Sequence, residues 1–337
     1  MARVSVIGAG SWGTALAMVL HHNGHQVCVW SAIDAEIQML REKHEQVEKL
    51  PGVLLSEDIR FTTELSEAIK GGTDMLVLAV PSPYTRSTSA AMKPYVKEGQ
   101  LIVSVAKGIE ENTLMTLSQI IKEEIPQCET AVLCGPSHAE EVGKELPTIL
   151  VAGAKKRETA EYVQNVFMNE VLRVYTSPDV LGMELGASLK NVIALAAGMA
   201  DGLGYGDNTK AALITRGISE MSRLAAAMGA RQETLSGLTG IGDLIVTCAS
   251  RHSRNRRAGF LMGQGYTMRQ AMDEVKMVVE GVYSARAAIA LGKKYHVSLP
   301  IIEQVNRVLF ENKSAKDGVT ELMIRDRKSE HEDLEWE

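Results

Sequence analysis

The chain has 337 residues, more than one typical domain, so its length predicts two domains. Hydrophobic residues make up 45% and charged residues 23%, which excludes wholesale disorder, and a formal net charge of −6 argues against non-specific nucleic-acid binding. No uncharged apolar run reaches the length of a membrane span, and the N-terminus has no secretory pattern. We expect a soluble, cytoplasmic protein without nucleic-acid or membrane partners.

Four cysteines are spread over the sequence without CxxC spacing and without the density of a disulfide framework. This usage predicts reduced thiols, as in a cytoplasm, and no metal site. The cysteines are Cys28, Cys128, Cys134 and Cys248.

Short apolar runs alternate with helix-length segments in the first half of the chain, for example Thr14–Asn23 and Asp34–His44. Several runs are almost continuously apolar, as expected for strands that are covered on both faces. This alternation predicts an α/β domain of the Rossmann type, with a parallel sheet and helices on both faces. The predicted strands are Arg3–Ile7, Gln26–Trp30, Arg60–Thr62, Met75–Val80, Leu101–Val105, Ala131–Cys134, Thr148–Val151 and Leu172–Tyr175.

Helical periodicity dominates after about residue 182, where the segments become rich in Ala, Leu and Met. Such short or flexible apolar side chains favour close helix packing, so the second domain is expected to be all-helical. We divide the chain into a dinucleotide-binding domain (1–181), a helical substrate domain (182–326) and an acidic tail without fixed structure (327–337).

A GxGxxG pattern, Gly8-Ala9-Gly10-Ser11-Trp12-Gly13, directly follows the first predicted strand and opens a helix. In this context Gly8 permits the tight turn, Gly10 lets a pyrophosphate approach the backbone, and Gly13 lets the helix pack closely on the sheet. The helix N-terminus then offers N–H groups to the phosphates. The competing interpretation is a structural turn without a ligand.

The end of the second predicted strand, Trp30, leaves the choice between NAD and NADP open. An NAD site places Asp or Glu there for the ribose, and an NADP site places a basic residue. Here Ser31-Ala32 follows, and we expect Asp34 to cap the next helix.

Lys190 and Asn191 lie beside the apolar helical run 192–197. A lysine in such surroundings either extends to solvent or is held in a cleft, where desolvation would bring its pKa toward neutrality. Periodicity alone favours the first alternative, and a general acid/base role is the second.

Asp243 follows a glycine-rich stretch and precedes another apolar run. Its carboxylate is equally compatible with a helix N-cap and with an active site. Thr247, four residues later, is expected on the same helix face.

The segment 250–257 contains four arginines together with His252, Ser253 and Asn255. In an acidic chain this composition predicts an anion pocket suited to phosphate, and the alternative is a solvated basic helix face. A single histidine without spaced partners is weak evidence for a metal.

Further polar loops follow predicted strands, where open α/β sheets bind ligands. Lys107 either contacts a substrate anion or ends its strand in solvent. Gly135 and Ser137 lie in the next such loop. By itself, Glu280 reads as an ordinary surface acid.

Taken together, these segments resemble the bacterial NAD(P)-dependent glycerol-3-phosphate dehydrogenase family, and they occur in one order over nearly the whole chain. The matching segments are Gly8–Ala17, Ala106–Gly108, Cys134–Glu140, Glu184–Asn191, Gly237–Thr247, Ser253–Asn255 and Val278–Gly281. The resemblance implies a Rossmann-type domain followed by an all-helical domain like that of 6-phosphogluconate dehydrogenase. It also implies reversible hydride transfer between dihydroxyacetone phosphate and sn-glycerol 3-phosphate for phospholipid synthesis, NAD or NADP as cofactor, and a homodimer.

The resemblance also implies roles for individual residues. Lys190 falls on the catalytic acid/base position, with Asp243 holding the ammonium and Asn191 or Thr247 assisting. Cofactor positions fall on Gly8, Gly10, Ser11, Trp12, Gly13, Ala32, Lys107, Ala139, Arg254, Val278 and Glu280. Substrate positions fall on Lys107, Gly135, Ser137, Lys190, Asp243, Ser253, Arg254 and Asn255. Many members carry Arg after the second strand, where this sequence has Ser31-Ala32, so a strong NADP preference is not implied.

Two other functions compete with this one. A dehydrogenase of the same superfamily could act on a hydroxy acid, although the 253–257 cluster suits a dianion better than one carboxylate. The protein could instead be a non-catalytic dinucleotide sensor, but this function would not explain the presence of Lys190 and the arginine cluster.

Overall fold

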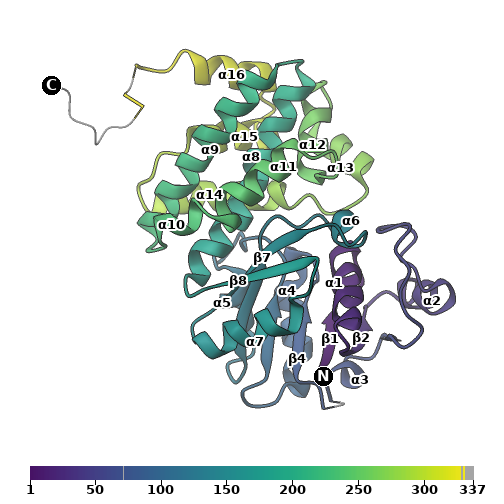
Figure 1. Ribbon diagram of the computed structural model, residues 1–337. Helices are drawn as coiled ribbons and strands as arrows, with labels where there is room; N and C mark the ends of the chain where they lie inside the picture. Colours follow the sequence, from purple (N-terminus) through teal and green to yellow (C-terminus); the bar gives the residue numbers. More distant parts are fainter. Residues whose placement is uncertain (71, 328, 331–337) are drawn as a thin grey trace.

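A computed structural model describes residues 1–70, 72–327 and 329–330 of the chain. The first part is an eight-stranded sheet in the order β3-β2-β1-β4-β5-β6-β7-β8 (Figure 1). Its strands are β1 (Arg3–Ile7), β2 (Gln26–Trp30), β3 (Arg60–Thr62), β4 (Met75–Leu78), β5 (Leu101–Ser104), β6 (Glu129–Cys134), β7 (Thr148–Ala154) and β8 (Leu172–Ser177). The helices around it are α1 (Ser11–His22), α2 (Asp34–Lys43), α3 (Leu65–Lys70), α4 (Thr85–Met92), α5 (Leu117–Glu124), α6 (Ala139–Val142) and α7 (Arg157–Phe167).

Different helices cover the two faces of the sheet. Met75 and Val77 of β4 belong to an apolar cluster completed by α1, α2, α6 and α7, whereas Leu76 and Leu78 belong to a cluster completed by α3, α4 and α5. Alternate residues of a strand point to opposite faces, so a strand covered on both sides must be apolar throughout. All eight predicted strands are confirmed, with ends that differ by up to three residues.

The predicted parallel sheet is confirmed except at one pair of strands. β7 runs antiparallel to β6, with Cys134 opposite Val151. A parallel pair needs a connection that crosses the sheet, usually through a helix. The helix between these strands, α6, has four residues and packs at the end of α1, so the chain returns beside β6 in the opposite direction.

The second part is helical, as expected: after β8, the described residues contain no further strand. Its helices are α8 (Val180–Gly202), α9 (Asp207–Ala227), α10 (Gln232–Leu235), α11 (Asp243–Ala249), α12 (Arg254–Gly263), α13 (Met268–Val275), α14 (Glu280–Lys294), α15 (Pro300–Phe310) and α16 (Ala315–Met323). The predicted division after residue 181 stays a prediction. Residues 328 and 331–337 of the expected acidic tail lie outside the described residues.

The other helices of the second part pack around α8, except α13, which packs on α12 (Figure 1). Among the described residues it is the one helix long and apolar enough to cross a membrane, yet 89% of its most apolar stretch is buried inside the protein. At its crossing with α12, a Cβ on Gly259 would lie 2.1 Å from the carbonyl oxygen of Leu195. Glycine is therefore needed for this approach, which places α12 directly against the helix that carries Lys190.

Candidate functional site

The glycine turn after β1 has the geometry of a phosphate-binding loop. Gly8 has φ of +127°, and a Cβ on Gly13 would lie 2.0 Å from the Gly8 carbonyl oxygen. Both positions therefore require glycine. In front of Gly10, by contrast, no heavy atom lies within 4 Å of where a Cβ would be.

Around this turn, donor groups are left available for a ligand. α1 begins at Ser11, and no described side chain caps its N-terminus. The indole Nε1 of Trp12 is buried and has no hydrogen-bond partner among the described residues. An uncapped N-terminus over open space and a buried unpaired donor fit a dinucleotide with its pyrophosphate at Gly10.

Lys190 lies in the interior of α8 and is only 5% exposed. Its Nζ is 2.8 Å from Oδ1 of Asp243 and donates to Oγ1 of Thr247 at 2.6 Å. The expectation that such a lysine extends to solvent is wrong, because α11 brings a carboxylate and a hydroxyl to the ammonium. Thr247 in turn donates to the carbonyl oxygen of Asp243 at 2.6 Å, so the predicted shared face of Asp243 and Thr247 is confirmed.

Asp243 is 1% exposed and is the first residue of α11 after the π-helical turn η3 (Leu238–Gly242). No described side chain caps this helix, so Asp243 does not act as the N-cap that its sequence position allowed. Its second oxygen, Oδ2, accepts from the ammonium of Lys107 at 2.6 Å. One carboxylate therefore holds two lysines, one from each part of the protein.

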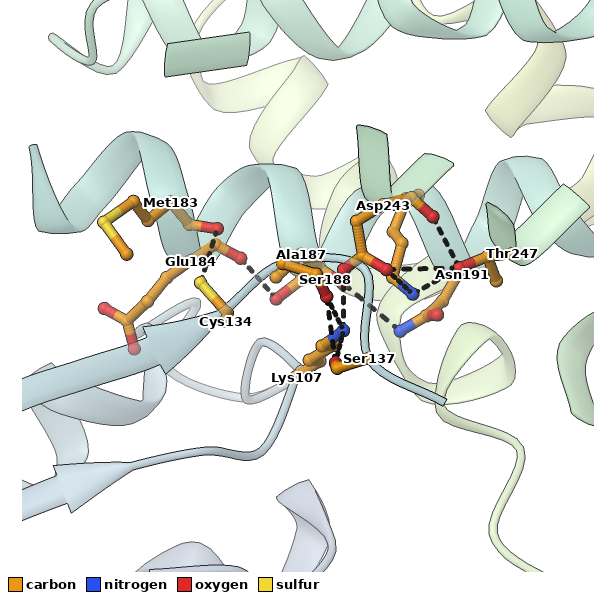
Figure 2. Close-up of polar contacts among 12 residues, drawn as sticks. Lys107, Cys134, Ser137, Met183, Glu184, Ala187, Ser188, Asn191, Asp243 and Thr247 are labelled. Atoms are coloured by element: carbon orange, nitrogen blue, oxygen red, sulfur yellow. Dashed lines mark hydrogen bonds and ion pairs between the residues drawn. The ribbon is translucent and has the colours of Figure 1, made fainter. Parts of the chain in front are cut away.

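Lys107 follows β5 and does not end in solvent. Its Nζ also donates to the carbonyl oxygen of Gly135 at 2.9 Å and to Oγ of Ser137 at 3.1 Å. In Figure 2, Lys107 and Ser137 lie below α8, and dashed lines connect Lys107 with Ser137 and Asp243, and Asp243 with Thr247. The carboxyl ends of β5 and β6 thus meet the helical part at Asp243.

Burial lowers the pKa of Lys190 to about 8; Asp243 opposes this shift and Lys107 adds to it. Burial would also raise the pKa of Asp243, but Lys107 and Lys190 outweigh it and hold that pKa below its ordinary value. Asp243 is therefore ionised at neutral pH, while Lys190 can both give and take a proton.

Asn191, the neighbour of Lys190, points to a different partner. Its Oδ1 accepts from the amide of Asn255 at 3.0 Å, and Oδ1 of Asn255 accepts from the backbone N–H of Gly281 at 2.8 Å. These contacts join α8, α12 and α14. Asn191 and Asn255 thus hold the N-terminal end of α12, where Arg254 lies, against α8.

The four arginines of the cluster have different surroundings. Arg254 is half-buried and donates to the carbonyl oxygen of Val278 at 3.2 Å, whereas Arg256 forms an ion pair of 2.6 Å with Asp201. Arg251 and Arg257 are exposed. The predicted four-arginine pocket is therefore reduced to Arg254, because successive helix positions point in different directions.

Ser253 is buried, and its hydroxyl accepts from the backbone N–H of Arg256, which makes it the N-cap of α12.

Glu280 is not an ordinary surface acid. Its carboxylate accepts from the backbone N–H of Ser82 at 3.0 Å and from the Ser82 hydroxyl, and burial raises its pKa. Ser82 lies in η1 (Ser82–Tyr84) after β4. This contact joins the sheet to the first residue of α14, beside Arg254 and Val278.

His252 lies against His138, with ring centroids 6.0 Å apart. Burial lowers the pKa of His138, and Lys190 and Lys107 lower it further. The described residues contain no group of three or more His, Cys, Asp or Glu side chains placed to hold a metal ion. All four cysteines are free, as their spacing predicted, and all four are buried.

The remaining cofactor candidates lie in two places. Ala139 is buried at the start of α6, and the exposed Ala32 follows β2. Asp34 is the first residue of α2 and does not cap it, because the N-cap position belongs to Ile33.

Two family models cover most of this sequence. The one described as NAD-dependent glycerol-3-phosphate dehydrogenase N-terminus matches residues 3–160, and the one for the C-terminus matches residues 179–320. The chain belongs to the NAD-dependent glycerol-3-phosphate dehydrogenase family.

Individual relatives agree with this membership. The chain is 70% identical over 336 residues to glycerol-3-phosphate dehydrogenase (NAD(P)+) of Agathobacter rectalis, with 100% of both chains covered. It is 59% identical over 332 residues to the protein of that name from Fusobacterium nucleatum, covering 98% of this chain and 99% of that one. The crystal structure of glycerol-3-phosphate dehydrogenase from Coxiella burnetii has 34% identity and a TM-score of 0.93, covering 96% of this chain and 99% of that one. The resemblance inferred from the motifs is confirmed.

In this dehydrogenase fold, two pairs of residues that the sequence did not connect join the two parts. Glu184 of α8 is 7% exposed and accepts from the backbone N–H and hydroxyl of Ser118 in α5, at 2.8 and 2.6 Å. Ser82 meets Glu280, as described above. No sequence signal marked these pairs, because their members lie far apart in the chain and each residue type is common on surfaces.

Proposed function

We propose that this chain catalyses reversible hydride transfer between dihydroxyacetone phosphate and sn-glycerol 3-phosphate, with NAD or NADP as cofactor. The product would supply the glycerol backbone of phospholipids. Glycerol-3-phosphate dehydrogenase (NAD(P)+) is the name of the 70% identical relative. The observation that carries the proposal is the buried Lys190, held by Asp243 and Thr247 where the helical part meets the carboxyl ends of β5 and β6.

In the proposed reaction, Lys190 handles the proton. During ketone reduction its protonated Nζ delivers a proton to the carbonyl oxygen, and during alcohol oxidation the neutral amine accepts it. Before the transfer, the ammonium also stabilises the negative charge that develops on that oxygen. Asp243 and Thr247 fix the direction of Nζ, and a pKa of about 8 keeps both protonation states accessible.

The turn at Gly8–Gly13 would hold the dinucleotide, with the N–H groups of α1 on its pyrophosphate. When bound, the nicotinamide supplies or accepts the hydride. We assign the chain's cofactor contacts to Ser11, Trp12, Ala32, Lys107, Ala139, Arg254, Val278 and Glu280. The open space at Gly10 and the unpaired indole N–H of Trp12 support this assignment.

We assign the substrate phosphate to Arg254, with Ser253 and Asn255 on the same helix end. The Asn255–Asn191 bond holds this helix end against α8, the helix of Lys190, and the Val278 contact holds the guanidinium of Arg254. Lys107, Gly135 and Ser137 would bind the rest of the substrate. Holding the phosphate orients the carbonyl toward Nζ of Lys190.

An absorbance assay tests the reaction directly. Purified protein is mixed with dihydroxyacetone phosphate and either NADH or NADPH, and oxidation of the nicotinamide is followed. We expect turnover with this substrate and little with a panel of keto acids that lack phosphate. Preference for a keto acid would support the hydroxy-acid alternative, and cofactor binding without turnover of any substrate would support the sensor.

We further propose that the protein is a cytoplasmic homodimer that does not bind nucleic acid. The net charge of −6 and the burial of α8 inside the protein support a water-soluble enzyme with small-molecule substrates. Light scattering after size-exclusion chromatography tests the dimer, and cell fractionation tests the location.

A further inference from the structure

The end of β2 carries an acid that the sequence did not reveal. Glu36, in the first turn of α2, is 6% exposed, and its Oε2 accepts from the hydroxyl of Ser31 at 2.6 Å. Its Oε1 forms an ion pair with Lys49. A search for an acid directly after Trp30 misses Glu36, because the turn into α2 brings its carboxylate back to the strand end.

This acid lies beside the glycine turn. The backbone N–H of Gly8 donates to the carbonyl oxygen of Trp30 at 2.8 Å, so Ser31 follows a residue bonded to the turn. Gln46, between α2 and Lys49, donates from its side chain to the carbonyl oxygen of Ala9 at 2.9 Å. The chain therefore contacts the glycine turn both before Glu36, at Trp30, and after it, at Gln46. In a Rossmann-type fold this is where the adenosine ribose lies.

The groups at this place are ill suited to a 2′-phosphate. The Ser31 hydroxyl already donates to Glu36 and accepts from the backbone N–H of Ile33 at 3.1 Å. Arg41 donates a hydrogen bond from Nη2 to the carbonyl oxygen of Phe61 at 2.7 Å. Lys49 is neutralised by Glu36. A phosphate dianion would thus lie next to a buried carboxylate, whereas a ribose 2′-hydroxyl can donate to it.

We propose that Glu36 acts as the ribose-binding acid of this chain and makes it selective for NAD(H) over NADP(H). This inference rests on the proposed function, since it requires a dinucleotide in the crevice at Gly10. Lys49 is a positioning residue, because it holds the carboxylate and compensates its charge without offering a free cation to a phosphate.

Direct binding tests the proposal. NADH and NADPH are titrated into the full-length protein by calorimetry without substrate, and kcat/KM with dihydroxyacetone phosphate is measured for each. We expect NADH to bind at least about tenfold more tightly, the lower end of the range for a hydrogen bond to a charged group. Glu36→Gln keeps the shape of the side chain and removes its charge, so it should lower the Kd for NADPH. The ratio of the Kd for NADPH to the Kd for NADH should therefore fall severalfold. Lys49→Met should raise this ratio, because the carboxylate of Glu36 then loses its compensating charge.

Glu67→Gln is the matched control. Glu67, in α3, also accepts from a hydroxyl five residues earlier, that of Thr62 at 2.7 Å, but Thr62 belongs to the edge strand β3 and not to the strand that leads into segment 31–49. Its replacement should leave the binding ratio unchanged. Equal or tighter binding of NADPH by the wild type, or an unchanged ratio in a folded Glu36→Gln protein, would overturn the inference. Failure to bind either cofactor or to reduce the substrate would instead contradict the proposed function.

Discussion

Lys190 and Asp243 form an ion pair of 2.8 Å although the two residues are only 5% and 1% exposed. Two charges removed from water cost several kcal/mol each unless they are paired and hydrogen-bonded. Here the cost is offset by a second ammonium, Lys107, on the other carboxylate oxygen at 2.6 Å and by Thr247. The resulting group carries one net positive charge at the junction of the two parts, where the site is assigned to an anionic substrate.

Replacing Lys190 by Ala is expected to lower kcat for dihydroxyacetone phosphate reduction by at least about 100-fold, since a positioned acid contributes this much or more. NADH binding should persist, because the glycine turn is unaffected. Lys210→Ala is the control: Lys210 pairs with Asp201 at 3.0 Å and not with Asp243, and its loss should leave kcat near that of the wild type. Equal kcat in Lys190→Ala and the wild type would refute the assignment.

The pH dependence of the reaction should follow Lys190. Reduction needs the protonated amine, so kcat/KM should fall as the pH rises through about 8, and oxidation should rise over the same range. Asp243 raises this pKa and Lys107 lowers it. Asp243→Asn should therefore move the reduction limb to lower pH, and Lys107→Ala should move it to higher pH.

Profiles of kcat/KM against pH for the wild type, Asp243→Asn and Lys107→Ala measure the direction of each shift. Each profile is normalised to its own maximum, so that the loss of rate does not affect the comparison. Shifts of the same sign in the two variants would contradict the electrostatic argument, whatever the loss of rate. Lys107→Arg, which keeps the positive charge, is the control that should leave the limb close to its wild-type position.

Arg254→Ala is expected to lower kcat/KM for dihydroxyacetone phosphate by about tenfold to 100-fold, the range for losing a hydrogen bond to a charged group. Added phosphite or phosphate should restore part of the loss. Arg257 is exposed, so Arg257→Ala should change nothing. Arg256 binds Asp201, so Arg256→Ala should lower Tm and leave the response to phosphite unaltered. Steady-state kinetics without any loss for Arg254→Ala would remove the phosphate-binding role.

Glu220 predicts a pH-dependent stability. It is 3% exposed in α9, accepts from the backbone N–H groups of Ile301 and Ile302 in α15, and burial raises its pKa to about 7. An acid with a raised pKa in the folded state contributes stability that is complete below its unfolded pKa of about 4.5 and is lost as the pH rises through about 7. Glu220→Gln keeps an acceptor and cannot ionise, so the difference in unfolding free energy should move in favour of the variant across this window.

Denaturant unfolding of both proteins at acidic and neutral pH measures this change, which should reach about 3 kcal/mol at 1.36 kcal/mol for each pKa unit. A constant difference at all pH values would show that Glu220 does not titrate on folding. Glu220→Ala should be less stable at every pH, because the two N–H groups lose their acceptor.

Features that depend on neighbouring residues could be predicted from the sequence. The strand at Arg3–Ile7, the turn at Gly8–Gly13 and the start of α1 follow from local backbone requirements and alternation of side chains. The two-part order, with a sheet and then helices, follows in the same way. The motifs also identified the family, since their order along the chain does not depend on folding.

Tertiary structure decided the environment of each charged side chain. It selected burial over exposure for Lys190, removed Asp243 from helix capping, and turned Arg256 away toward Asp201. It also set β7 antiparallel to β6 and brought the carboxylate of Glu36 to the hydroxyl of Ser31. Periodicity describes a single helix or strand, whereas the protonation and partners of a side chain depend on groups that other segments bring within a few ångströms, and only the folded chain places those groups.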